Sequence, residues 1–187
     1  MVSIVDMFSI VNYLAFCSKN FKFEDFISCS ETYQAVLVKN DPNRDATYDF
    51  ITQLANDILE PCLAEFGNLK LTYGFCGHGL SSAIKKRRGG IHPPLDQHAG
   101  MELNAKGDLI CSRGGMAADF HCLPISSLEV AKFIIERLPF DRLYFYGEGR
   151  PIHVSINKEL VSQIVIMKKS KTRVVPRRVV KEAFLSM

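Results

Sequence analysis

Residues 108–122 read DLICSRGGMAADFHC and combine a glycine pair, two alanines, an aspartate and a histidine with two cysteines. Small side chains such as those of Ala117 and Ala118 let a neighbouring backbone or a ligand approach closely. A carboxylate at such a crowded position needs an ionic partner or a metal ion. Asp119 is therefore a candidate metal ligand, and a tight turn that leads into a buried strand is the alternative interpretation.

Two segments on either side of this stretch predict helices. Residues 45–67, DATYDFITQLANDILEPCLAEFG, place apolar side chains at helical spacing and end at Gly67. Residues 126–138, SSLEVAKFIIERL, begin with the capping box of Ser126 and Glu129. Both segments are expected to direct one apolar face inward.

Three further segments predict strands. LKLTYGF (69–75) alternates in polarity, and residues 97–120 read as two strands joined by the turn AKGD. RLYFYGEGRPIHVSI (142–156) reads as a hairpin in which His153 points to the opposite face from its two aliphatic neighbours. Helices followed by strands mixed with one helix indicate an α+β fold with an antiparallel sheet.

Length and composition predict one domain with a tail. With 187 residues, 47% of them hydrophobic, the chain supports one core, which we place in residues 1–167, followed by a basic tail at 168–187. The apolar residues 1–20 contain Asp6 and have no basic leading region or cleavage site, so we expect an amphipathic helix. No apolar run reaches the roughly 20 residues that span a bilayer. Together with six scattered cysteines, these features predict a cytoplasmic protein with reduced thiols and no membrane span.

Positive charge is concentrated near the C-terminus. The formal net charge is +3, but Lys168–Lys181 contains seven basic residues and no acid, so the rest of the chain is mildly acidic. Such a segment is suited to contact a polyanion or a protein, and a solvated terminus is the alternative. The run KKRRGG at 85–90 is a second basic site, which we interpret as a loop.

Three segments resemble, in the same order, the motifs of one zinc peptidase family. GMAADF (115–120) is similar to the second half of the motif S-x-H-x-x-G-x-A-x-D of the M15 metallopeptidases, which include D-alanyl-D-alanine carboxypeptidases and have the DD-peptidase/hedgehog fold. FDRLYFYGEGRPIHVSI (140–156) resembles the signature that carries the last zinc histidine, and LKLTYGFCGHGLSSAI (69–84) resembles an upstream strand and helix. The resemblance covers about residues 69–157.

This resemblance implies that Asp119 and His153 are zinc ligands. The family's first histidine stands three residues before the motif glycine, where this chain has Ser112, a poor zinc ligand. DQHAG, which contains His98, is similar to the family's SQHxxG, as though a loop had been inserted between the two ligands. His98 is therefore the predicted first ligand, and His121 is the alternative. Three protein ligands leave a fourth position for water, as in catalytic zinc sites.

A hydrolytic zinc site also needs a base that takes a proton from water. In the family this base is a glutamate shortly before the last histidine, which implies Glu148, five residues before His153. Glu102, four residues after His98, is the competing candidate.

The family's arginine in the motif GYR is replaced here by Cys76 in GFC. That arginine resembles a clamp for a substrate carboxylate or a developing oxyanion. Arg113 as a catalytic residue and Arg150 as a substrate-binding residue are the available replacements, and ordinary surface positions are the alternative. Cys76 also precedes His78 by two residues, which raises the hypothesis of a thiolate nucleophile.

The sequence therefore predicts a zinc-dependent hydrolase that cleaves an amide bond in a peptide or a peptidoglycan stem peptide. The alternative is a catalytically inactive protein of the same fold that binds a partner or nucleic acid through KKRR and the basic tail. Zinc binding distinguishes the two, because the second function predicts little or none.

Overall fold

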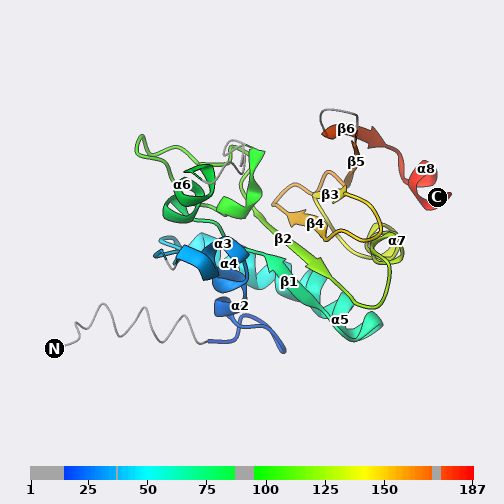
Figure 1. The fold of residues 1–187 in the computed structure, drawn as a ribbon, viewed down its shortest axis with the longest axis horizontal. Helices are drawn as coiled ribbons and strands as arrows, with labels where there is room; N and C mark the ends of the chain where they lie inside the picture. Colours follow the sequence, from blue (N-terminus) through cyan, green and yellow to red (C-terminus); the bar gives the residue numbers. More distant parts are fainter. Residues whose placement is uncertain (1–14, 37, 87–94, 170–173) are drawn as a thin grey trace.

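The computed structural model describes residues 15–36, 38–86, 95–169 and 174–187. In these residues the strands form one sheet with the order β1-β2-β4-β3-β5-β6, and helices pack beside it (Figure 1). The predicted α+β class is confirmed. The strands are β1 (Lys70–Tyr73), β2 (Met116–His121), β3 (Arg142–Phe145), β4 (Ile152–Ile156), β5 (Gln163–Lys169) and β6 (Val174–Val179).

The sheet is mixed, so the prediction of a purely antiparallel sheet was wrong. β3 and β4 form the predicted hairpin, and β2 pairs antiparallel with β4, but β5 runs parallel to β3. By the end of β4 the chain has returned to the level at which β3 begins, since Ser155 pairs with Arg142. The short link 157–162 then places Gln163 beside Arg142, and β5 follows the direction of β3.

The two predicted helices are confirmed. Residues 45–66 are continuously helical with one π-helical turn, and Gly67 ends the segment at φ +82°. The second helix begins at the predicted cap, where the Ser126 hydroxyl accepts from the Glu129 N–H. The helical elements are α2 (Phe23–Ser28), α3 (Glu31–Val36), α4 (Asp45–Leu54), η1 (Ala55–Leu59), α5 (Glu60–Phe66), α6 (His78–Lys86), η3 (Gln97–Ala99), α7 (Ser127–Arg137) and α8 (Lys181–Leu185).

The core lies between one face of the sheet and the helices. Phe120 of β2 and Val154 of β4 are fully buried in the same hydrophobic cluster as apolar side chains of α4 and α7. Neighbouring residues in a strand point to opposite faces. Asp119 and His153 therefore lie on the face of the sheet that is directed away from this core.

Residues 168–187, which we expected to form a basic tail, extend the sheet and pack on the domain over their described positions. β6 pairs antiparallel with β5 and forms the edge of the sheet (Figure 1). Phe184 of α8 is fully buried, with its ring 5.5 Å from that of Phe145. Burial of such a ring stabilises the fold by about 1.5–3 kcal/mol, which explains why this charged segment is anchored.

Two sequence-based expectations fall wholly or partly outside the described residues. These are the amphipathic helix at residues 1–20, of which 1–14 are not described, and the KKRRGG loop, of which 87–90 are not described. Within the described ranges, no helix combines the length and the apolar character needed to cross a membrane. All six cysteines are free thiols.

Candidate metal site

Four residues form a row across the sheet. The strand register pairs Tyr73 of β1 with Asp119 of β2, and Asp119 with His153 of β4. His153 pairs in turn with Tyr144 of β3. Directly paired residues on neighbouring strands project from the same face. The row therefore places a carboxylate beside an imidazole, with an aromatic side chain at each end.

The side chains of His98, Asp119 and His153 converge on this face. Asp119 Oδ1 lies 2.8 Å from His153 Nδ1 and 3.3 Å from His98 Nε2. The third side of the triangle, from His98 Nε2 to His153 Nδ1, is 3.2 Å. Among the residues that the structure describes, these three form the group that could hold a metal ion. The three ligands predicted from the sequence are thus brought together.

His98 reaches the cluster from the 3-10 turn η3 rather than from the expected strand. The Asp96 carboxylate at the start of this turn accepts from the His98 N–H at 3.0 Å. His98 Nδ1 lies 2.7 Å from the Gly74 carbonyl oxygen. Because a carbonyl only accepts, Nδ1 carries the proton and donates it, so Nε2 of the neutral imidazole faces the cluster with its lone pair.

The loop between His98 and Asp119 folds back on itself. Leu103 and Leu109 form a single antiparallel bridge, and Gly107 turns the chain at φ +86°. Of the two strands that we expected in residues 97–120, the second is formed as β2, and the first is replaced by this bridge because residues 97–99 form the 3-10 turn η3 instead. Two backbone hydrogen bonds, from Asn104 N–H to the Asp108 carbonyl and from Ile110 N–H to the Glu102 carbonyl, also join the two arms of the loop.

A buried amide fastens the turn that carries His98. Gln97 Nε2 donates to the Gly114 carbonyl at 3.0 Å and to Asp141 Oδ2 at 2.9 Å. Gln97 Oε1 accepts from the Ser155 hydroxyl at 2.9 Å. These bonds connect η3 to the segments that begin β2 and β3 and to β4. They therefore fix the position of His98 against the sheet.

The charges in the cluster influence one another. Burial alone would raise the pKa of the Asp119 carboxyl, but His98 and His153 together hold it well below its usual range. Burial would lower the pKa of His98, but the Asp119 carboxylate, the Asp96 carboxylate and the Gly74 carbonyl together raise it above its usual value. The carboxylate is therefore ionised at neutral pH and attracts a cation, either a proton on His98 or a metal ion.

Arg113 contacts the rim of the cluster. Its Nη1 donates to the Tyr144 hydroxyl at 3.2 Å and to the Leu95 carbonyl at 3.5 Å. The Tyr144 ring packs edge-on against His153, with 5.0 Å between the ring centroids. The predicted catalytic arginine is thus one side chain removed from a candidate ligand.

Glu148 and Arg150 lie in the turn between β3 and β4, and both are exposed. The Glu148 backbone carbonyl accepts from the Ser127 N–H at 3.2 Å, which ties the turn to the start of α7. The Glu148 carboxylate stands on the solvent-exposed part of this turn. Its role as the base stays a prediction.

His121, the alternative first ligand, is not one of the three converging residues. It lies two residues after Asp119 on β2 and lines a groove with Lys70 and Arg150. Burial lowers its pKa, and the positive charges of Lys70 and Arg150 lower it further. The structure therefore favours His98 as the third member of the cluster.

Glu102, the competing base, links two segments of the fold. Its carboxylate is buried and accepts from the backbone and side-chain nitrogens of Asn43, each at 3.1 Å, and from the Thr47 hydroxyl at 2.8 Å. These bonds engage both oxygens. They give Glu102 a structural role at the start of α4.

Replacing Glu102 by glutamine is expected to lower the free energy of unfolding by about 1–2 kcal/mol. The reason is that one of the two carboxylate oxygens of residue 102 is replaced by an NH₂ group, which cannot accept the hydrogen bond that Asn43 or Thr47 donates at that position. Zinc affinity is expected to stay unchanged. Urea denaturation and zinc titration measure the two quantities, and a loss of hydrolysis at full stability would instead assign Glu102 to the chemistry.

Cys76 does not have the properties of a nucleophile. Its side chain is only 3% exposed, and burial raises the pKa of its thiol to about 12. Burial also raises the pKa of Cys17 and Cys122 to about 12. The thiolate is the reactive form of cysteine. These three thiols are therefore protonated and unreactive at neutral pH.

We expect Cys17, Cys76 and Cys122 to resist alkylation in the folded protein between about pH 7 and pH 9. Because each pKa is raised, the thiolate fraction grows only as the pH approaches 12, well above the ordinary thiol value. Mass spectrometry after iodoacetamide treatment, with and without urea, counts the modified residues. Rapid modification of Cys76 without urea at pH 8 would contradict the assignment.

Three contributors to the site were not found from the sequence: the Gly74 carbonyl, Gln97 and Tyr144. Tyr144 stands at an alternating position of a predicted strand, but only the strand register shows that it pairs with His153. No sequence pattern marks a backbone carbonyl as the partner of a histidine. Gln97 is adjacent to His98, and this proximity was the one available signal.

Comparisons of this chain with known protein families, with curated proteins and with solved structures found no match. The class of the protein therefore rests on its site, which is a candidate His-Asp-His metal centre on one face of an α+β fold.

Proposed function

We propose that this chain is a zinc-dependent hydrolase that cleaves an amide bond in a peptide or a peptidoglycan stem peptide. The observation that carries the proposal is the triangle formed by His98 Nε2, Asp119 Oδ1 and His153 Nδ1. Two imidazoles and one carboxylate are typical ligands of catalytic zinc. The resemblance of three segments to the M15 metallopeptidases supports the same assignment.

The triangle has nearly the size that zinc requires. Ligand atoms about 2.0–2.1 Å from a tetrahedral zinc ion lie about 3.3 Å from one another. The three distances here are 2.8, 3.2 and 3.3 Å, so small side-chain shifts satisfy this geometry. Most zinc-binding histidines donate their second ring N–H to a nearby acceptor, and this bond orients the ring. For His98 the acceptor is the Gly74 carbonyl oxygen.

Zinc in this site would supply a Lewis acid that polarises a carbonyl group and lowers the pKa of water toward 7. The chain's own residues have the remaining tasks. Arg113 is the proposed group that stabilises negative charge on a substrate oxygen, and its hydrogen bond to the Tyr144 hydroxyl at the rim of the cluster supports this role. Glu148 is the proposed base, and this role requires the turn between β3 and β4 to bring its carboxylate toward the cluster.

Metal analysis of untagged protein, followed by peptide and muropeptide hydrolysis, tests the proposal. We expect about one zinc ion per chain, the stoichiometry of a single catalytic site. Hydrolysis is expected to stop after chelation and to return when zinc is added. Well-folded protein with neither bound zinc nor affinity for added zinc would overturn the proposal.

A binding role through the basic segment is the second candidate function. Arg177 and Arg178 of β6 have exposed side chains. Lys168 and Lys181, in the same basic segment, are exposed as well. Binding to a polyanion through such residues weakens as salt is added. An Arg177→Gln/Arg178→Gln variant tests this role without removing Phe184, and unchanged binding to DNA or RNA would exclude it.

A further inference from the structure

A groove with a basic end adjoins the metal cluster. It has a volume of about 510 Å³ and is lined by residues of β1, β2, the turn before β4 and the segment that begins α3. Tyr73 belongs to this lining and also pairs with Asp119 in the row of site residues. Lys70, His121 and Arg150 line the same groove. We call it the β1 groove.

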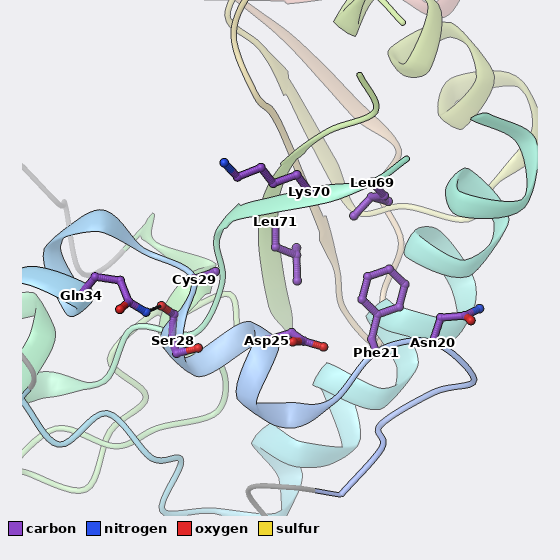
Figure 2. Close-up of a pocket in the computed structure, with 9 residues that line it drawn as sticks. All are labelled: Asn20, Phe21, Asp25, Ser28, Cys29, Gln34, Leu69, Lys70 and Leu71. Carbon is purple, nitrogen blue, oxygen red and sulfur yellow. Dashed lines mark hydrogen bonds between the residues drawn. The ribbon is translucent and has the colours of Figure 1, made fainter. Parts of the chain in front are cut away.

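The basic residues of the β1 groove project from the site face of the sheet. Lys70 pairs with His121 across β1 and β2, so the two side chains share a face. Figure 2 shows Lys70 and Leu71 on opposite sides of β1, with Leu71 directed toward a second hollow beside α2. This hollow shares Cys29, Lys70 and Leu71 with the β1 groove. His121 is two residues from Asp119, which places both on one face of β2. The groove therefore runs beside the metal cluster, from Tyr73, whose ring packs against that of His98, toward Lys70.

Arg150 gives the groove its second permanent positive charge. It is exposed in the turn that leads into β4, and its neighbour Pro151 also lines the groove. Glu31, at the start of α3, is an acidic residue in the lining. The basic side chains of Lys70 and Arg150 outnumber it, so the groove favours an anionic group.

Building on the proposed hydrolase function, we propose that the β1 groove binds an extended peptide that carries a carboxylate about two residues from the hydrolysed bond. Successive strand residues rise about 3.3 Å, so Asp119 and His121 are separated by about 7 Å along β2. An extended peptide along the groove has the same rise per residue. Lys70 and Arg150 bind its carboxylate through charge-assisted hydrogen bonds. A C-terminal carboxylate and an acidic side chain offer the same chemistry.

Fluorescence anisotropy with three labelled alanine-rich hexapeptides tests this inference. The first peptide has a free C-terminal carboxylate, the second is amidated, and the third is amidated and contains an internal glutamate. Each is titrated with the full chain, both zinc-loaded and chelated. The proteins compared are the wild type, the Lys70→Gln/Arg150→Gln double variant and the control Lys106→Gln, whose side chain is exposed in the loop that follows Glu102.

We expect at least one carboxylate-bearing peptide to bind about tenfold more tightly than the neutral peptide. The double variant is expected to lose this preference and the Lys106→Gln control to keep it. The peptide that shows the preference identifies the C-terminus or the side chain as its source. Equal affinities for the three peptides, absence of binding, or a preference that survives the double substitution would overturn the inference. Zinc affinity, measured on the same samples, separates failure of the groove from failure of the metal site.

Discussion

The Asp119→Asn variant is expected to bind zinc at least about 100-fold more weakly than the wild-type protein. The substitution keeps the shape of the side chain but removes the negative charge that lies 2.8 Å from His153 and 3.3 Å from His98. A neutral amide is a poor zinc ligand compared with a carboxylate. Titration against a competing chromophoric chelator measures the affinity, and circular dichroism verifies that the variant is folded.

The matched control for this prediction is His121→Ala. His121 is on the same strand face as Asp119 but outside the metal cluster, so its removal is expected to leave zinc affinity within about twofold of the wild type. His98→Ala and His153→Ala are expected to behave like Asp119→Asn. If His121→Ala lost zinc and His98→Ala retained it, the first ligand would be His121, and the geometry described here would be wrong.

The Gly115→Ala variant is expected to lose at least about 3 kcal/mol of stability. Gly115 has φ +77°, a conformation that is unfavourable for alanine. A Cβ atom there would clash with the Ile156 carbonyl oxygen and would lie 3.0 Å from its carbonyl carbon. Because both atoms belong to the backbone at the end of β4, the clash is relieved only if β2 and β4 separate. Urea denaturation measures the loss.

Gly107→Ala separates the two causes of this loss. Gly107 has φ +86°, close to the value at Gly115, but a Cβ atom there meets nothing within 4 Å. Its substitution therefore adds conformational strain without a clash and is expected to cost about 1 kcal/mol. Equal losses in the two variants would show that strain rather than the close approach of β4 determines the need for glycine at position 115.

Elements whose contacts are local in sequence were predicted correctly. The predicted N-cap at Ser126 begins α7, and the aromatic strand, turn and His153 strand form the β3–β4 hairpin. Their hydrogen bonds join residues that are close in the chain, so residue type and spacing contain the necessary information. The mixed sheet could not be predicted in this way. The parallel pairing of β5 depends on the edge of β3 that stays unpaired after the β3–β4 hairpin has formed.

By itself, the sequence determined that Asp119 and His153 stand on strands at positions that alternate with buried apolar residues, since polarity and spacing are sufficient for that conclusion. Only the tertiary structure decided that His98 rather than His121 joins them, that Glu102 is engaged with the start of α4, and that the basic segment extends the sheet. The physical reason is that these outcomes depend on bonds between distant residues. Gln97, for example, reaches Asp141 and Ser155, and no local preference encodes such contacts.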